Sequence, residues 1–344
     1  MSFVSNAVLA KSREVYGRRL TAEDYSRLAS MKTVPDVCEY LKQTPRYAEA
    51  LAQVNSRTVH REWLEELLKG AVYGVFESFH IFDYSSCNSY FKFIVARLEI
   101  EQIIAAVSAI ISGGSDYYIA ALPAFITKNS KVDLLALAGA GNIGKAAEIL
   151  RKTMYCSGKN LKKMLEQAAG TGELNLPEFE RELYSEYYLA LLNSIEKRFF
   201  GREKREFKTA VLKTIDMENV VTSYREARFS GISSEENRAL LIPLKYRLSA
   251  DEIEELAKEK SVEKIALLLE KKGCHGSNSG TIELLTDSIS FNSLEKTIRL
   301  SRSPAVVYFA LTQCLSIELN NIKTLIEGVR YGLNGSDILK MLVL

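Results

Sequence analysis

Apolar residues recur through most of the chain at the three-to-four-residue spacing of an amphipathic helix. A short example begins at Val34, where apolar side chains at positions i, i+3, i+4 and i+7 share one face. Three longer helical patterns each end near a glycine, as helix C-termini often do. They span residues 90–112, 203–229 and 305–331, with glycines at Gly113, Gly114, Gly231 and Gly332. Strand signals are weak, because the best candidate, residues 119–126, contains Pro123. The pattern predicts an all-α fold.

A block of sequence near the start of the chain recurs near residue 250. Residues 19–29 and 247–257 both begin with Arg-Leu and a hydroxyl residue, and an acid follows three positions after the hydroxyl. This is a capping box, in which the hydroxyl accepts a hydrogen bond from a first-turn amide and the acid accepts one from the amide of the hydroxyl residue. The middle of the chain supplies a third copy, since residues 28–44 align with residues 137–153. In every copy an N-cap residue precedes the second helix, namely Thr33, Asn142 and Ser261.

A second block recurs inside each long helical pattern. Its copies are Glu99–Ile103, Asp216–Val220 and Glu318–Ile322. The later two patterns also share a basic residue before an aromatic one, at Arg228-Phe229 and Arg330-Tyr331. Together the two blocks predict three similar helical units of roughly 110–120 residues. The predicted units are residues 1–116, 117–232 and 233–344.

The composition is that of an ordinary globular protein. Apolar residues make up 47% and charged residues 26% of the chain, which excludes disordered and collagen-like proteins. The 6 Pro and 19 Gly among 344 residues are too few for an all-β fold, which needs many turns. The 45 Lys and Arg nearly balance the 43 Asp and Glu, leaving a net charge of +2. No strong field therefore points to nucleic acid or to an acidic membrane surface.

Neither a signal peptide nor a transmembrane helix is predicted. Residues 1–20 lack an apolar core, and the most apolar stretch, residues 103–111, is far shorter than the about 20 residues that cross a bilayer. We therefore expect a cytoplasmic protein.

The residues that usually carry chemistry are scattered. The cysteines and histidines show no clustered spacing, so we expect reduced thiols and no metal site. They are Cys38, Cys87, Cys156, Cys274, Cys314, His60, His80 and His275. Neither a G-x-S-x-G elbow nor a phosphate-binding P-loop occurs. We expect no catalytic residues and no cofactor.

One glycine-rich segment matches the pattern of a nucleotide-binding motif. Residues 139–144 read Gly-Ala-Gly-Asn-Ile-Gly and fit G-x-G-x-x-G, which in dinucleotide sites brings backbone close to a pyrophosphate. The equivalent positions of the other copies, residues 30–35 and 258–263, contain no glycine, yet they too join two helical patterns. A helix–helix turn is therefore favoured over a nucleotide site. A single basic cluster, residues 197–205, is diluted by glutamates and favours a helix junction or a protein-partner patch over RNA binding.

Segments at the start, middle and end of the chain match one family when taken in order. They are residues 6–13 and 19–28, residues 216–220 with Arg225 and Arg228, and residues 304–308 and 317–332. In this order they resemble the C subunit of archaeal and bacterial A/V-type ATPases, a relative of the d subunit of eukaryotic V-ATPases. The resemblance covers essentially the whole chain. The first unit departs most, with Glu101-Gln102 where the later copies have Glu218-Asn219 and Asn320-Asn321.

The resemblance implies a funnel of three helical domains with pseudo-threefold symmetry. Such a protein is a non-catalytic part of the central stalk, or rotor, present in one copy per complex. It lies on the cytoplasmic face of the membrane ring of proteolipid (c-type) subunits and accepts the end of the central shaft in its cavity. It transmits torque during ion transport, and it binds no nucleotide, no nucleic acid and no small-molecule substrate.

Four residues are expected at the shaft interface under this hypothesis: Arg228, Arg330, Asn219 and Asn321. An alternative for the two arginines is that they neutralise carbonyls at helix C-termini. Two other functions remain open on the sequence alone. One is a helical-repeat scaffold for another protein partner, and the other is a nucleotide-binding enzyme that uses Gly139, Gly141 and Gly144.

Overall fold

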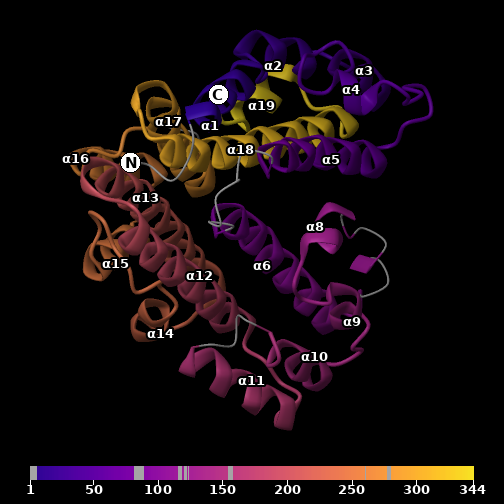
Figure 1. The fold of residues 1–344 in the computed structure, drawn as a ribbon. Coiled ribbons are helices and arrows are strands. Elements are labelled where there is room, and N and C mark those ends of the chain that lie inside the picture. The colour runs from indigo at the N-terminus through magenta and orange to yellow at the C-terminus, as the bar shows by residue number, and fades with distance from the viewer. Residues whose placement is uncertain are drawn as a thin grey trace. The chain divides into compact units, whose positions relative to one another are not determined.

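The computed structural model describes residues 6–80, 89–114, 118, 119, 122, 124–153, 158–259, 261–276 and 280–344. Every regular element within these residues is a helix, which confirms the predicted all-α fold. The strand candidate at residues 119–126 lies partly outside them, and its described end from Ala124 onward is helical. The chain forms two compact units, and their helices are labelled in Figure 1.

The first unit combines residues 1–86, 201–232 and 245–344. Its helices are α1 (Asn6–Gly17), α2 (Ala22–Ala29), α3 (Val34–Leu41), α4 (Ala48–Leu51), α5 (Arg61–His80), α13 (Gly201–Arg225), the π-helix η1 (Glu226–Ser230), α15 (Ala250–Lys258), α16 (Val262–Lys271), α17 (Ile282–Leu300), α18 (Pro304–Arg330) and α19 (Gly335–Lys340).

Helix α18 is the centre of this unit. Ser303 caps its first turn by accepting a hydrogen bond from the Val306 amide, and the left-handed Gly332 (φ +69°) follows its end. Most of its residues are buried, as expected of a helix that other helices surround. It packs against α1, α5, α13 and α17, and Figure 1 shows α1, α5 and α17 lying beside it.

A continuous apolar core joins α18 to α2, α3, α5 and α19. Leu28, Leu64 and Ile322 are wholly buried in it, and each such side chain contributes about 1.5–3 kcal/mol to folding. At one point the core packing requires a glycine. A Cβ atom on Gly335 would lie 2.9 Å from the Ala29 carbonyl oxygen, so α19 approaches the end of α2 only because Gly335 has no side chain.

The predicted helix caps are confirmed. Thr21 with Asp24, and Ser249 with Glu252, form complete capping boxes at the starts of α2 and α15. The second caps also form, since the side chains of Thr33, Asn142 and Ser261 accept first-turn amides. The long helical patterns match α6, α13 and α18 within a few residues, except that the last turn after α13 is the π-helix η1.

The second unit combines residues 87–200 and 233–244. Its helices are α6 (Ser89–Ser112), α8 (Ala124–Asn129), α9 (Leu134–Ala138), α10 (Ile143–Leu150), α11 (Lys159–Thr171), α12 (Leu176–Arg198) and α14 (Ser234–Ala239). Helix α6 packs against α8, α9, α10 and α12, and α10 packs along α11. The junction after Arg198 is a short turn between helices, as the basic cluster predicted.

Candidate functional site

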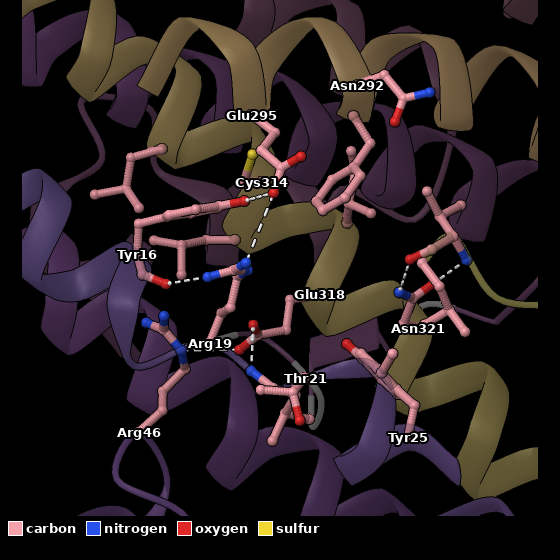
Figure 2. A pocket seen from close by; sticks show the side chains of 18 residues that line it. Tyr16, Arg19, Thr21, Tyr25, Arg46, Asn292, Glu295, Cys314, Glu318 and Asn321 are labelled. Carbon is pink, nitrogen blue, oxygen red and sulfur yellow. Dashed lines mark hydrogen bonds and ion pairs between the residues drawn. The ribbon is translucent and has the colours of Figure 1, made fainter. Parts of the chain in front are cut away.

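Glu318 on α18 holds the segment that precedes α2, far away in the sequence. Its side chain is buried. One carboxylate oxygen accepts a hydrogen bond from the Leu20 amide (3.2 Å), and the other accepts one from the Tyr47 hydroxyl (2.8 Å). The guanidinium of Arg46, with a side chain only 3% exposed, forms an ion pair with the same carboxylate at 2.8 Å. Figure 2 shows Glu318 between Arg46 and Thr21.

Burial and charge act against each other at Glu318. Burial raises the pKa of this carboxyl group, whereas the Arg46 charge, the Tyr47 hydroxyl and the Leu20 amide each favour its ionised form. Burial also raises the pKa of Tyr47 well above its ordinary value, and the Glu318 charge adds to that rise. Tyr47 is therefore a protonated donor at neutral pH. Removing one partner of such a buried pair costs about 3–5 kcal/mol, because the other charge is then left alone.

Asp216 on α13 makes an equivalent contact. Its carboxylate accepts hydrogen bonds from the amides of Tyr246 (2.9 Å), Arg247 (2.8 Å) and Leu248 (3.2 Å), directly before the Ser249 cap of α15. Burial raises the pKa of Asp216, and the three amides work in the opposite direction. Hydrogen bonds to a charged acceptor contribute about 1.5–3 kcal/mol each, so this carboxylate fixes the entry to α15.

Glu99 on α6 makes the third contact of this kind, within the second unit. It accepts hydrogen bonds from the amides of Lys131 (2.7 Å) and Val132 (2.9 Å), and the next residue, Asp133, caps α9. Glu99, Asp216 and Glu318 are the first residues of the three copies of the recurring block. Each therefore holds the residues just before the first helix of a repeat.

The pairing has a cyclic order along the sequence. We call the residues just before the first helix of each copy its entry segment. Glu99, in the first copy, binds the entry segment of the second copy at Val132, and Asp216, in the second copy, binds that of the third at Leu248. Glu318, in the third copy, binds the entry segment of the first copy at Leu20. Each contact thus joins residues on opposite sides of a predicted unit boundary, or the last predicted unit to the first. The division into residues 1–116, 117–232 and 233–344 stays a prediction.

The sequence signal for these contacts is incomplete. The acids stand in one column of the recurring block, and the Arg-Leu-hydroxyl entry is recognisable at residues 19–21 and 247–249. The third entry segment, Lys131-Val132-Asp133, has the same order of basic, apolar and N-cap residues. Its residue types differ from Arg-Leu-hydroxyl, so a search for that motif does not find it. The sequence also does not reveal which acid binds which entry segment, because no local pattern links residues that lie up to 298 positions apart.

A pocket of about 260 Å³ opens beside Glu318, between α1, α2, α17 and α18 (Figure 2). The Tyr16 hydroxyl donates to Glu295 (2.9 Å), and Arg19 stacks on the Tyr16 ring at 4.1 Å and lies 3.6 Å from Glu295. Burial raises the pKa of Cys314, which also lines the pocket. Its charged groups pair with one another, so the pocket presents little free charge to a ligand.

Asn321 and Asn219, two of the expected shaft contacts, are buried in the first unit. The Asn321 amide nitrogen donates to the Val343 carbonyl (2.6 Å), and its oxygen accepts from the Val343 amide (2.9 Å). This pair of bonds fixes the end of the chain against α18. Asn219 lies on the buried side of α13.

The two arginines have different surroundings. Arg228 lies in η1, stacks on the Tyr224 ring at 4.2 Å and donates to the Glu259 carbonyl at the end of α15 (2.6 Å). The contact is of the kind expected from the alternative interpretation, a cation at a helix C-terminus. Arg330 is exposed, pairs with Glu327 (3.0 Å) and donates to the Tyr331 hydroxyl (2.7 Å). The shaft interface stays a prediction.

The glycine-rich segment forms a turn between two helices, as predicted. Helix α9 ends before Gly139, Gly141 adopts a left-handed backbone (φ +72°), and Asn142 caps α10. A Cβ atom on Gly144 would lie 3.4 Å from the Ala169 carbonyl oxygen, so this glycine serves the close packing of α10 on α11. Since both neighbours are helices, the strand of a dinucleotide fold does not precede the turn.

Two other kinds of feature are absent from the described part of the chain. Among the described residues no His, Cys, Asp and Glu side chains gather in a group of three or more that could bind a metal ion. No described helix combines the length and hydropathy needed to cross a membrane.

Comparison with known proteins relates the chain to components of ATP synthases. It is 26% identical over 240 residues to the C subunit of the A-type ATP synthase of Thermococcus onnurineus, covering 68% of this chain and 60% of that protein. It is 27% identical over 237 residues to the C subunit of Thermococcus kodakarensis, with the same coverage. The C subunit of Methanocaldococcus jannaschii is 28% identical over 169 residues, which are 46% of this chain and 42% of that protein.

The match to these relatives is partial, whereas the match to the family is nearly complete. The chain spans about 60% of the length of the Thermococcus relatives. The model of the ATP synthase (C/AC39) subunit family, however, matches residues 8–341. This range contains Glu99, Asp216, Glu318 and all three entry segments that they hold. The chain belongs to the ATP synthase (C/AC39) subunit family.

Proposed function

We propose that this chain is a non-catalytic central-stalk subunit of an A/V-type ATP synthase. In this role it couples the central shaft to the membrane ring of proteolipid subunits during ion transport. The observation that carries the proposal is the family match over residues 8–341, to which the similarity to the C subunits of A-type ATP synthases adds. The proposal includes a pseudo-threefold funnel, one copy per complex and a place on the cytoplasmic face of the membrane.

A protein that couples shaft and ring must transmit torque without yielding, and the first unit has features suited to this. Helix α18 is buried along most of its length, and close-packed interiors are hardly compressible. The Glu318–Arg46 pair ties α18 to the segment between α3 and α4, and the Leu20 bond ties it to the start of α2. Load applied to one helix is thereby shared with elements from the opposite end of the sequence.

The buried carboxylates have structural partners that fit a non-catalytic role. Buried acids with raised pKa values are often catalytic. Here, however, both oxygens of Glu318 and of Asp216 accept hydrogen bonds from the chain's own donors. Their lone pairs are engaged in holding helix entries.

We place the shaft contact at the ends of α13 and α18. Arg330 is exposed beside Tyr331, whose side chain is 71% exposed, and Phe229 next to Arg228 is 83% exposed. Exposed aromatic side chains beside arginine are the residue types that dominate protein interfaces. Asn219 and Asn321, which are buried, support the helices that carry this surface.

Co-purification tests the proposed function. A tagged full-length chain is isolated from its own membranes after mild detergent extraction. We expect shaft and ring subunits of the ATP synthase to accompany it. Capture of other proteins without any ATPase subunit would favour the scaffold alternative and overturn the proposal.

A charge-reversal variant tests the shaft contact separately. Arg330→Glu should weaken binding of the isolated shaft about tenfold or more while leaving the melting temperature nearly unchanged, because the side chain is exposed. Lys32→Glu, a change at another exposed cation of the first unit, serves as the matched control. Unchanged shaft affinity in both Arg330→Glu and Arg228→Glu would remove the assignment.

A further inference from the structure

A second cavity of the first unit, about 270 Å³ in volume, is lined by basic side chains. Helices α13 and α17 form two of its walls, and the segments at residues 246–247 and 273–275 form the others. Lys213 projects from α13, Lys296 from α17 and Arg247 from the entry to α15, and His275 lies at the rim. Three cations from three separate parts of the chain thus meet at one cavity.

None of these cations has a carboxylate partner among the described residues. The Lys213 ammonium donates to the Ser293 hydroxyl (3.0 Å), and one nitrogen of Arg247 donates to the Lys272 carbonyl (2.6 Å). Lys296 makes neither a hydrogen bond nor an ion pair with any described residue. Elsewhere in this unit, lysines and arginines pair with acids, as Lys258 does with Glu254 and Arg299 with Glu295.

The acid that lines the cavity does not neutralise this charge by direct contact. Asp216 is buried, and its two oxygens accept the amides of residues 246, 247 and 248. Among the described residues it is the one acid on the cavity wall, against three cations and a histidine. The wall therefore carries an excess of positive charge.

The rest of the wall offers further hydrogen-bonding groups. Ser290 contributes a hydroxyl group, whereas Thr214 and Thr297 donate their hydroxyl protons to the carbonyls of Ala210 (3.2 Å) and Ser293 (2.8 Å). The Asn292 amide donates to the His275 carbonyl (3.2 Å), which fixes the rim of the cavity. Arg247 donates one of its five N–H groups to Lys272, and its guanidinium lies over the Tyr246 ring at 5.2 Å. Its other N–H groups have no hydrogen-bond partner among the described residues.

We infer that this cavity binds a small phosphate-type oxyanion, such as inorganic phosphate or pyrophosphate. Lysine ammonium groups bind phosphate as point charges, and an arginine adds directed donors. The cavity is slightly smaller than typical sites for drug-sized ligands, so its size suits pyrophosphate better than a whole nucleotide. The inference stands independently of the rotor role, since it depends only on the charges of the first unit.

Calorimetry with the full chain tests the site. Pyrophosphate titrated at low ionic strength should give saturable binding of one anion per chain, weakened by added NaCl. Lys296→Gln should weaken it about fivefold, and the Lys213→Gln, Lys296→Gln double variant by at least about tenfold more. Lys32→Gln, at an exposed lysine elsewhere in the unit that has no partner among the described residues, should leave the affinity unchanged.

Three results would overturn the inference. One is the absence of saturable heat up to about 10 mM pyrophosphate. Another is an equal loss of affinity in Lys32→Gln and Lys296→Gln, which would mean diffuse attraction by surface charge. The third is citrate binding as tightly as pyrophosphate, because the site would then not select phosphate.

Cys274 provides a reporter inside the cavity. Its thiol is free and half-buried and lines the cavity wall. We expect pyrophosphate to slow its alkylation by N-ethylmaleimide, followed by peptide mass spectrometry. The protection should disappear in the Lys213→Gln, Lys296→Gln double variant. Protection is measured against each protein's own rate without ligand, because the Lys213 charge lowers the pKa of Cys274 and its loss slows alkylation. Equal protection in parent and double variant would place the anion elsewhere and overturn the site.

Discussion

The carboxylate of Glu318 accepts the backbone amide of Leu20, 298 residues earlier in the chain, at 3.2 Å. The bond connects the last long helix with the first capped helix of the sequence. Because Asp216 and Glu99 make the equivalent contact with the entry segments at 248 and 132, it is the third instance of one recurring interaction. Substitutions at these carboxylates should therefore act on helix entries that lie far away in the sequence.

Replacing Glu318 should destabilise the chain severely. Glu318→Ala leaves the buried Arg46 guanidinium without its carboxylate, and we expect a loss of about 3–5 kcal/mol in the free energy of unfolding. Urea denaturation followed by circular dichroism measures it. Glu49→Gln, at an exposed acid of the same unit, should change stability by less than about 0.5 kcal/mol. Similar losses in both variants would contradict the role given to Glu318.

Asp216→Asn should loosen the entry to α15 locally. The amide side chain keeps the size of the carboxylate, but it lacks the charge that holds three backbone amides. We expect a loss of about 2–3 kcal/mol. Compared with the parent, the variant should show faster hydrogen exchange at residues 246–248 and in α15, whereas exchange in α3 should be unchanged. A uniform rise across the whole unit would instead point to general destabilisation.

Acid stability should depend on Glu252. Hydrogen bonds from Lys272 and from Ser249 hold the pKa of Glu252 at about 2, below its ordinary value of 4.5. Above pH 4.5 this carboxylate is ionised in both states, and its contacts stabilise the folded chain. As the pH falls from 4.5 towards 2, the unfolded state binds the proton first and the stabilisation is lost.

Glu252→Gln should therefore be less stable than the parent at neutral pH and should lose less stability on acidification. Urea midpoints measured between about pH 6 and pH 3 test this. Glu49→Gln, at an exposed acid, serves again as the control. Parallel curves for Glu252→Gln and the parent would contradict the depressed pKa of Glu252.

Two glycine substitutions should act in opposite directions. Gly70 lies inside α5 with open space around its missing Cβ, so Gly70→Ala should stabilise the chain by about 0.5–1 kcal/mol. Gly335→Ala places a Cβ 2.9 Å from the Ala29 carbonyl oxygen and should cost about 1–3 kcal/mol. Thermal melting distinguishes the two, and stabilisation by Gly335→Ala would show that α19 does not pack on α2 as described.

The local structure was largely predictable from sequence. The caps at Thr21, Asn142 and Ser249 and the glycine ends of the long helices follow from hydrogen bonds and backbone angles within a few residues. The carboxylate contacts were not predictable, because the type of residue at 318 does not reveal which distant amide it meets. The burial of Asn321, expected on a binding surface, likewise depends on where residue 343 lies.

The hydrogen bond between Glu318 and Leu20 also limits how the sequence could have arisen by duplication of a repeat. An open array of repeats has two outer faces and needs specialised capping repeats to cover them. Here the last acid has the first entry segment as its partner, so neither terminal copy lacks a neighbour for this contact. Losing one copy would leave an acid without amides and amides without an acid.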